Sequence, residues 1–335
     1  MPEKPKLAMY WASSCGGCEL SLVNLHEKIL DVDRAFEFVF CPCLLDTKEK
    51  DIEAMPDGAI ALTLFNGAIR NADNEHIAQL LRRKSQLLIA YGSCSGGGCI
   101  PALSNLSGRD EIFHTNYCSG PSLSNPEALA PEPVTQVPEG KLKLPVFFES
   151  VRTLAQTVDV DYFIPGCPPE SPQVWKVVEE VVGGKPLPPH GSVFGAGKST
   201  VCEECKRLKN DKRIQRLYRT FEIIPDPDTC LFEQGLVCMG IATRDGCGAL
   251  CPQVNMPCIG CYGPPEGVRD QGAKMIAALG SVLNGDDHKN LDENQLRTKV
   301  DDIIGAIPDL AGTFYKFSLA DSILQHRRAG CSKSR

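Results

Sequence analysis

The chain has 335 residues, with 35 lysines and arginines against 42 aspartates and glutamates, which gives a formal net charge of -7. This length suits two or three domains, the 23% charged and 42% hydrophobic residues exclude wholesale disorder, and the acidic balance argues against nucleic acid as the main partner. Cysteine is the unusual residue, because the chain contains 17 of them.

Strand-like and helix-like segments alternate over about the first 190 residues. Residue patterning predicts strands at Lys6–Trp11, Phe36–Phe40, Ala59–Phe65, Gln86–Tyr91 and Tyr162–Ile164, and helices at Glu19–Leu30, Glu75–Arg83 and Pro172–Val182. Since strands that alternate with helices form βαβ units, the sequence predicts an α/β fold with a mostly parallel, doubly wound sheet.

The rest of the chain divides by composition. A Pro/Ser/Glu-rich stretch from Cys118 to Pro145 predicts a long surface loop or a partner-facing insertion, and residues 183–197 indicate a linker. Residues 202–261 show little regular pattern, and helical patterns return at 271–283 and 300–310 before a polar tail. We therefore predict a sheet domain over 1–190, a cysteine-rich domain over 195–268 and a helical C-terminal extension over 269–335.

Three roles compete for so many cysteines: disulfides, structural zinc and iron–sulfur clusters. Disulfides belong to oxidising compartments, and the first residues (MPEKPKLAMYW) lack the apolar core, the twin arginine and the cleavage site of an export signal. No run reaches the roughly 18 apolar residues that span a bilayer. We therefore expect a cytoplasmic protein without membrane insertion, whose thiols stay reduced and can bind metal.

Three cysteine-bearing turns each follow a predicted strand. In a parallel doubly wound sheet such turns lie at one carboxyl edge, where ligands bind, and neighbouring glycines let the backbone approach bulky sulfur atoms. The alternative is that these cysteines are small buried hydrophobic residues. That explanation would suffice for one such turn, but it is weaker for three turns at the same sheet edge. The four cysteines are Cys15, Cys18, Cys94 and Cys167.

Eight further cysteines follow the pattern C-x2-C-x24-C-x7-C-x8-C-x3-C-x6-C-x2-C. Their number suits two four-iron clusters. Zinc is the alternative, because four-cysteine sites with paired C-x2-C ends are common, although the absence of histidine from residues 202–261 excludes mixed Cys/His zinc there. The eight are Cys202, Cys205, Cys230, Cys238, Cys247, Cys251, Cys258 and Cys261.

On these motifs the chain resembles the small subunit of nickel–iron hydrogenases over about residues 6–265. Cys-Gly-Gly-Cys-Glu at 15–19, Gly-Ser-Cys at 92–94 and Pro-Gly-Cys-Pro-Pro at 165–169 match, in order, the turns that hold that family's proximal cluster. The resemblance implies a flavodoxin-like first domain, an irregular iron–sulfur domain after it, and a helical extension.

The resemblance also implies three 4Fe-4S clusters and their ligands. The proximal cluster would be held by Cys15, Cys18, Cys94 and Cys167, the medial cluster by Cys247, Cys251, Cys258 and Cys261, and the distal cluster by Cys202, Cys205, Cys230 and Cys238.

Two departures from the membrane-bound uptake members of this family are informative. Those members have histidine as the first distal ligand, where Cys202 stands here, and they lack a fourth medial cysteine, which Cys251 supplies. Thiolate adds negative charge relative to imidazole and so lowers a cluster's potential. The segments NGAIR, LLRRKSQLLIAYGSC and VNMPCIGC most resemble the cytoplasmic methyl-viologen-reducing, or factor-420-non-reducing, type that associates with heterodisulfide reductase.

The resemblance implies no catalytic residue in this chain, because the nickel–iron centre of the family lies in a separate large subunit. The implied role is to carry electrons from dihydrogen oxidation to a further partner, heterodisulfide reductase reached through a small iron–sulfur adaptor. Two alternatives remain: the cluster subunit of a quinone reductase, which shares the proximal-type turns but typically shows adjacent cysteines, and a non-enzymatic zinc scaffold.

Five cysteines stay outside the twelve: Cys41, Cys43, Cys99, Cys118 and Cys331. We expect Cys41 and Cys43 to be buried packing, and Cys99 to compete with Cys94 as a ligand, with the turn context favouring Cys94. Glu19 is expected to orient the proximal site or to be simply a carboxylate at a helix N-terminus. The basic run 206–219 indicates a solvated helix face or a docking patch beside the distal cluster.

Overall fold

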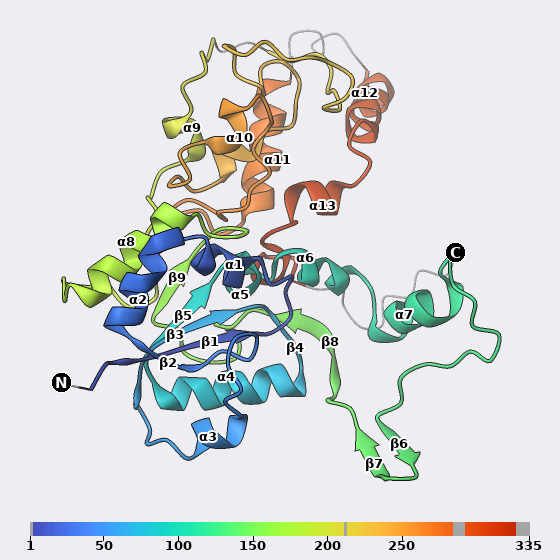
Figure 1. Cartoon of the computed structure of the whole chain (residues 1–335). Helices are drawn as coiled ribbons and strands as arrows, with labels where there is room; N and C mark the ends of the chain where they lie inside the picture. The colour runs from blue at the N-terminus through green and yellow to red at the C-terminus, as the bar shows by residue number, and fades with distance from the viewer. Residues whose placement is uncertain (1–2, 211–212, 284–291, 326–335) are drawn as a thin grey trace.

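The computed structural model describes residues 3–210, 213–283 and 292–325. A sheet domain built from the first half of the chain lies below a second, mostly irregular domain (Figure 1). Within the described residues, no helix combines the length and the apolar character needed to cross a bilayer.

Six parallel strands form the central sheet in the order β10–β9–β5–β3–β1–β2. Their apolar, largely buried sequences are typical of parallel strands covered on both faces. The doubly wound parallel sheet predicted from the sequence is confirmed. The strands are β1 (Lys6–Trp11), β2 (Glu37–Phe40), β3 (Ile60–Asn66), β5 (Ser85–Tyr91), β9 (Tyr162–Ile164) and β10 (Ser192–Val193).

Helices cover both faces of this sheet. On one face, Leu22, Val32 and Val174 bury their side chains in one core. They lie on α1 (Gly17–Val23), α2 (Ile29–Ala35) and α8 (Ser171–Val182). On the other face, Ile52 and Ile77 pack from α3 (Glu49–Glu53) and α4 (Ala72–Lys84). Each fully buried aliphatic side chain contributes about 1.5–3 kcal/mol, so the two cores together fix the sheet and its edges.

The single helix predicted over Glu19–Leu30 is wrong. The chain leaves α1 at Val23, makes a 3-10 helix over His26–Lys28 and then enters α2. His26 has a φ of 55°, a left-handed conformation that interrupts a right-handed helix. The apolar spacing continues across this break, so hydrophobic periodicity alone cannot detect it.

The predicted surface insertion contains a β-hairpin. Strands β6 (Val134–Val137) and β7 (Gly140–Lys143) pair antiparallel and extend away from the body of the protein (Figure 1). The insertion starts in a π-helical turn (Thr115–Ser119) that follows α7 (Arg109–His114), and its exposed side chains confirm a surface position. The strands have four residues each, too few for a clear alternation against the Pro/Ser/Glu background.

Two other short pairings are absent from the sequence expectations. Strand β10 lies inside the predicted linker 183–197, where Ser192 and Val193 pair with β9 and extend the sheet. Strand β4 (Ile69–Asn71) pairs antiparallel with β8 (Phe147–Arg152) beside the main sheet. Strands β10 and β4, with two and three residues, carry too little pattern to be recognised from sequence.

The second domain has few regular elements, as predicted. Between residues 195 and 268 the structure shows only α9 (Val201–Glu204), a 3-10 helix (Met239–Ala242) and α10 (Leu250–Gln253) as helices, within the described range. Among the described residues after 268, the helices are α11 (Gln271–Val282), α12 (Glu293–Gly305), α13 (Leu310–Phe314) and a 3-10 helix (Leu319–Asp321). The helix predicted over 300–310 therefore starts earlier and ends before Pro308, and most of the polar tail lies outside the described residues.

The C-terminal segment packs onto the turn that follows β5. This turn consists of α5 (Ser93–Gly97), α6 (Cys99–Ala102) and a 3-10 helix (Leu103–Leu106). A Cβ at Gly97 would lie 2.3 Å from the carbonyl oxygen of Phe317, so only glycine permits the contact. The same segment is held by Gln156 Nε2, which donates to Ala320 O over 2.7 Å.

Gly97→Ala is expected to lower the free energy of unfolding by about 1–3 kcal/mol, because the added methyl group meets backbone rather than a movable side chain. Gly280→Ala on α11 is the matched control, since nothing lies within 4 Å of its Cβ and alanine there favours the helix by about 0.5–1 kcal/mol. Denaturant unfolding measures both. An equal loss of stability in the two variants would contradict the packing argument.

Candidate metal centres

The turns after β1, β5 and β9 meet at the carboxyl edge of the sheet. Strand β9 lies beside β5, and their turns are hydrogen-bonded: Gly92 N donates to Ile164 O over 2.8 Å, and Ser93 donates to Gly166 O from its amide and its hydroxyl over 2.8 and 2.9 Å. We call Cys15, Cys18, Cys94 and Cys167 the edge group. Their turns, far apart in sequence, lie at one place in the fold.

Glycine at position 92 is required for this arrangement. Gly92 has a φ of 84°, and a Cβ there would lie 2.3 Å from the Sγ of Cys18. Burial raises the pKa of Cys18, and the negative charges of Glu19 and Cys167 raise it further. A cation placed among these thiols reverses that balance and favours the thiolates, so the donor set suits a metal.

The buried carboxylate of Glu19 is held by the end of β3. Asn66 Nδ2 donates to both oxygens of Glu19, over 2.9 and 2.8 Å, and also to Ser14 Oγ over 2.8 Å. Burial raises the pKa of Glu19, and the hydrogen bond from Asn66 opposes that shift. Glu19 does lie in the first turn of α1, but its side chain is fixed beside the edge group by Asn66, a residue that the sequence analysis did not single out.

A second set of thiols lies in the upper domain. We call Cys202, Cys205, Cys230 and Cys238 the outer group. Burial raises the pKa of Cys202 to about 12, and the neighbouring Cys238 and Cys230 add to the shift. A Cβ at Gly240 would lie 3.2 Å from the Sγ of Cys202 and 3.7 Å from that of Cys238, so the backbone runs close to both sulfurs.

The third set lies between the other two. We call Cys247, Cys251, Cys258 and Cys261 the middle group. The pKa of Cys261 is raised to about 12, mainly by burial and then by the negative charges of Cys247, Cys251 and Cys167. Cys167 belongs to the edge group. On the opposite side, Cys258 N donates to the Sγ of Cys238 in the outer group over 3.3 Å.

These contacts arrange the three groups in series. Cys167 and Cys261 pack against the same small cluster of buried side chains, which connects the edge and middle groups. Ser93 adds a hydrogen bond from its hydroxyl to the carbonyl of Cys261. Cys258 and Cys238 connect the middle and outer groups. Thiol-bearing loops therefore follow one another without interruption from the sheet edge into the second domain.

Arg207 holds the loops of the outer and middle groups together. Its guanidinium donates twice to Pro252 O, over 3.0 and 2.9 Å, and also to Asp226 O, Thr229 O and Asn255 Oδ1. Arg207 is buried, so it is not part of a solvated face. The helix expected over the basic run 206–219 is also wrong, because α9 ends at Glu204 and the described residues of the run are irregular.

Glu204 performs a similar task between the same two groups. It stands between Cys202 and Cys205 in sequence, and its two oxygens accept from Gly246 N over 2.9 Å and from Gly248 N over 3.0 Å, the amides on either side of Cys247. One carboxylate thus ties a loop of the outer group to a loop of the middle group.

The five other cysteines differ in their positions. Cys41 is buried as expected, but Cys43 is exposed, which corrects the expectation that both are packing residues; their Sγ atoms lie 3.4 Å apart. Cys118 is exposed, and Cys331 lies outside the described residues. Cys99 lies beside the edge group, with its Sγ 3.9 Å from that of Cys167.

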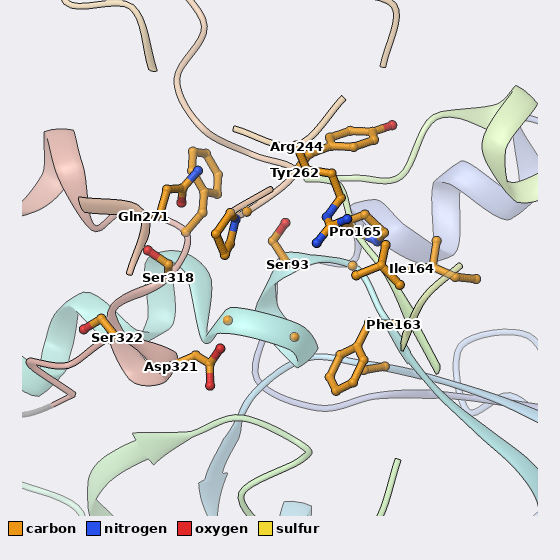
Figure 2. A pocket seen from close by; sticks show the side chains of 18 of the residues that line it. Ser93, Phe163, Ile164, Pro165, Arg244, Tyr262, Gln271, Ser318, Asp321 and Ser322 are labelled. Carbon is orange, nitrogen blue, oxygen red and sulfur yellow. The ribbon is translucent and has the colours of Figure 1, made fainter. Parts of the chain in front are cut away.

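A cavity of about 210 Å³ lies where the two domains meet (Figure 2). Ser93 and Tyr262, neighbours in sequence of Cys94 and Cys261, line it together with Arg244 and Asp321. Arg244 donates to Gly197 O over 2.7 Å, and Tyr262 donates to Gln173 Oε1 on α8 over 2.8 Å. The hydrogen bond from Tyr262 to α8 therefore helps to seat the middle group on the sheet domain.

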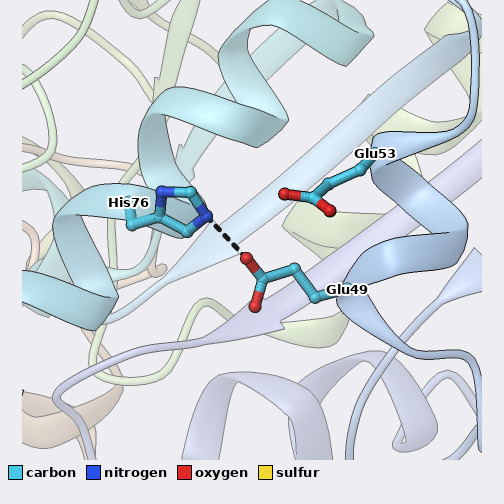
Figure 3. A group of neighbouring side chains, drawn as sticks. All are labelled: Glu49, Glu53 and His76. Carbon is cyan, nitrogen blue, oxygen red and sulfur yellow. Dashed lines mark hydrogen bonds and ion pairs between the residues drawn. The ribbon is translucent and has the colours of Figure 1, made fainter.

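Three potential ligands other than cysteine gather on two helices of the sheet domain. Glu49 and Glu53 on α3 and His76 on α4 place one ligand atom each within 4.8 Å of one another (Figure 3). His76 Nε2 and Glu49 Oε1 are 2.5 Å apart, and their side chains are 54% and 41% exposed. This geometry is that of a surface ion pair on the helices covering the other face of the sheet.

The chain matches one protein family over part of its length and individual hydrogenase subunits over nearly all of it. Residues 15–181 match the family described as "NADH ubiquinone oxidoreductase, 20 Kd subunit". Over nearly the whole chain, the protein is similar to the iron–sulfur subunit of the F420-non-reducing hydrogenase of Archaeoglobus profundus, with 40% identity over 96% of this chain and 98% of that protein. The corresponding F420-non-reducing hydrogenase subunit of Methanothermobacter marburgensis is 36% identical over 97% of both chains.

A solved structure supports the fold. The nickel–iron–selenium hydrogenase of Desulfovibrio vulgaris Hildenborough in its oxidized state has a chain that superposes with a TM-score of 0.50 and 18% identity. The match covers 79% of this chain and 95% of that chain, so it includes the second domain as well as the parallel sheet.

Glu204→Ala is expected to lower the free energy of unfolding by about 1–3 kcal/mol, because two amides lose a charged acceptor. Hydrogen exchange at Gly246 and Gly248 should quicken most. Glu203→Ala is the matched control, since Glu203 is exposed and adjacent, and should change stability by less than about 0.5 kcal/mol. Unchanged exchange at the two glycines in Glu204→Ala would refute this role.

Proposed function

Because the chain belongs to the family of F420-non-reducing hydrogenase iron–sulfur subunits, we propose that it carries electrons from dihydrogen oxidation, in a partner large subunit, through three 4Fe-4S clusters to a further redox protein. The observation that carries this proposal is the uninterrupted series of thiol groups, from Cys167 beside Cys261 to Cys258 beside Cys238. A cluster in each group would accept and pass on one electron at a time.

The proposed ligands follow the three groups. The edge group would hold the proximal cluster, the middle group the medial cluster and the outer group the distal cluster. Four thiolates per cluster is the ordinary ligation of a 4Fe-4S centre. Glycines at 92 and 240 admit the backbone close to sulfur, as such centres need. Buried thiols whose pKa is raised, such as Cys202, would release their protons as iron binds.

All-thiolate ligation supports a low-potential role for the two clusters of the second domain. Cys202 supplies a thiolate where histidine would be less negative, and Cys251 completes a fourth corner in the middle group. Both additions put negative charge beside the iron and lower the reduction potential. Reduced thiols are needed throughout, which favours the cytoplasm as the proposed location.

The surface beside Cys15 suits the large subunit. Cys15 is exposed, and an apolar groove runs past it, lined by Trp11, Leu20, Leu30 and Leu44 among others. Leu20 is 63% exposed in the isolated chain. A contiguous apolar patch at the start of the thiol series is typical of a protein interface, and it would place the partner's metal centre next to the proximal cluster.

The opposite end of the series suits the electron acceptor. Phe221 and Ile224 are 78% and 98% exposed in a segment that carries Arg213, Arg216 and Arg219, and Arg216 is paired with Glu222 over 3.1 Å. Apolar anchors inside a basic rim favour an acidic redox partner. We propose that this acceptor is heterodisulfide reductase reached through a small iron–sulfur adaptor, an extension that rests on the family resemblance.

The chain purified anaerobically in its native complex is expected to contain about 12 iron atoms per copy, from three four-iron clusters. Reduction should produce EPR signals of reduced 4Fe-4S centres, and metal analysis gives the stoichiometry. Stoichiometric zinc without iron would instead support the zinc scaffold and would sink the electron-transfer proposal.

Leu20→Asp combined with Leu44→Asp should weaken association with the large subunit at least about tenfold, because each buried leucine contributes about 1.5–3 kcal/mol and a buried carboxylate opposes binding. The measurement is the ratio of large to small subunit after affinity purification, together with hydrogen-dependent viologen reduction. Phe221→Asp is the control and should leave the ratio unchanged. Retention of the large subunit by the double variant would place the interface elsewhere.

A further inference from the structure

Five thiols lie at the proximal site, although the proposed cluster there uses only the four of the edge group. The fifth, Cys99, is 1% exposed, and its Sγ lies 3.9 Å from the Sγ of Cys167. It belongs to the same buried cluster as Cys94 and Phe317, against which Cys167 and Cys261 pack. Cys99 and Cys167 therefore present two sulfurs to one corner of the site.

The backbone at Cys99 is unusual for its residue type. Its φ is 47°, in the left-handed region that side chains other than glycine and asparagine rarely adopt. The preceding Gly98 has a φ of 87°, and a Cβ there would lie 2.6 Å from both Ala102 Cβ and Ala320 Cβ. The turn is thus tightly confined, and it holds a cysteine in a conformation better suited to glycine, with the thiol beside Cys167.

Packing alone does not account for this position. A small buried hydrophobe needs no left-handed backbone, and strained conformations persist where the surroundings impose them, most often at functional sites. A disulfide does not account for it either, because bonded sulfurs lie about 2.05 Å apart and these two are in van der Waals contact. Two free thiols at one corner of a metal site are competing donors.

We propose that Cys99 is a fifth thiolate donor of the proximal site and can bind the iron that Cys167 otherwise binds. The inference rests on the proposed function. The exchange would be balanced: the iron–sulfur bond to Cys167 would break, the bond to Cys99 would form, and the proton of the Cys99 thiol would pass to the Cys167 thiolate. No electron is transferred, so no oxidant or reductant is required.

The test is the iron content of wild type and four variants, each purified anaerobically in the complex. Wild type and Cys99→Ala should both contain about 12 iron atoms, and Cys15→Ala, which removes an exposed ligand that no other thiol replaces, about 8. Cys167→Ala should retain about 12, because Cys99 takes its place, whereas Cys167→Ala combined with Cys99→Ala should fall to about 8. EPR of the reduced proteins would follow the same proximal signal.

Each outcome has one meaning for this proposal. A fall of Cys167→Ala to the level of Cys15→Ala overturns it, and so does full iron in the double variant. The roughly 8 atoms left in the medial and distal clusters show that a variant has folded. Wild type without iron would contradict the proposed function itself, so failure of the two proposals can be told apart.

Discussion

The parallel register of four strands is the constraint on which the rest of the structure depends. Because β1, β3, β5 and β9 run in one direction and side by side, the turns that follow them open at one edge. This edge gathers thiols that the sequence spreads from Cys15 to Cys167, and it adds Asn66 from the end of β3, which fixes Glu19. Apolar cores on both faces of the sheet make the edge rigid. The position of the edge group is therefore a consequence of sheet geometry rather than of local sequence.

In the second domain the cysteine loops are held in position without a sheet. Its cysteine loops have few backbone ladders, so polar side chains fix them instead. Arg207 donates to three carbonyls on two stretches of chain, 226–229 and 252, and Glu204 accepts from the amides on either side of Cys247. A buried guanidinium is stable only when its hydrogen bonds are made, so Arg207 requires one arrangement of these loops. The arrangement of the loops in the second domain is therefore fixed by hydrogen bonds to charged side chains, whereas the sheet edge in the first domain is fixed by apolar packing.

Sequence reasoning succeeded where the signal is local. The buried strands were predictable because apolar runs bounded by Gly-rich turns are local. The division of the cysteines into three ligand sets came from the family resemblance rather than from spacing, and it stays a prediction. The break near His26 was not predictable, since apolar spacing continues through it. Asn66, Glu204 and Arg207 were not predictable because their partners lie 42 to 48 residues away in sequence or are backbone atoms of other loops. Cys99 could be suspected from its nearness to Cys94, but only the fold places it at Cys167.

If the proposed thiols bind iron, their raised pKa values would couple the folding of the second domain to iron binding. Cys202 and Cys261 hold their protons in the absence of a cation, and neighbouring thiolates would repel one another. Under the proposed ligation, bound iron would remove that repulsion and would join loops that little regular structure connects. The domain is not wholly dependent on metal, because Met275, Leu279 and Phe314 form a core with Ala102 and Val151 of the sheet domain. The contact among these five apolar side chains uses no thiol, so it holds the second domain against the sheet domain independently of the proposed ligation.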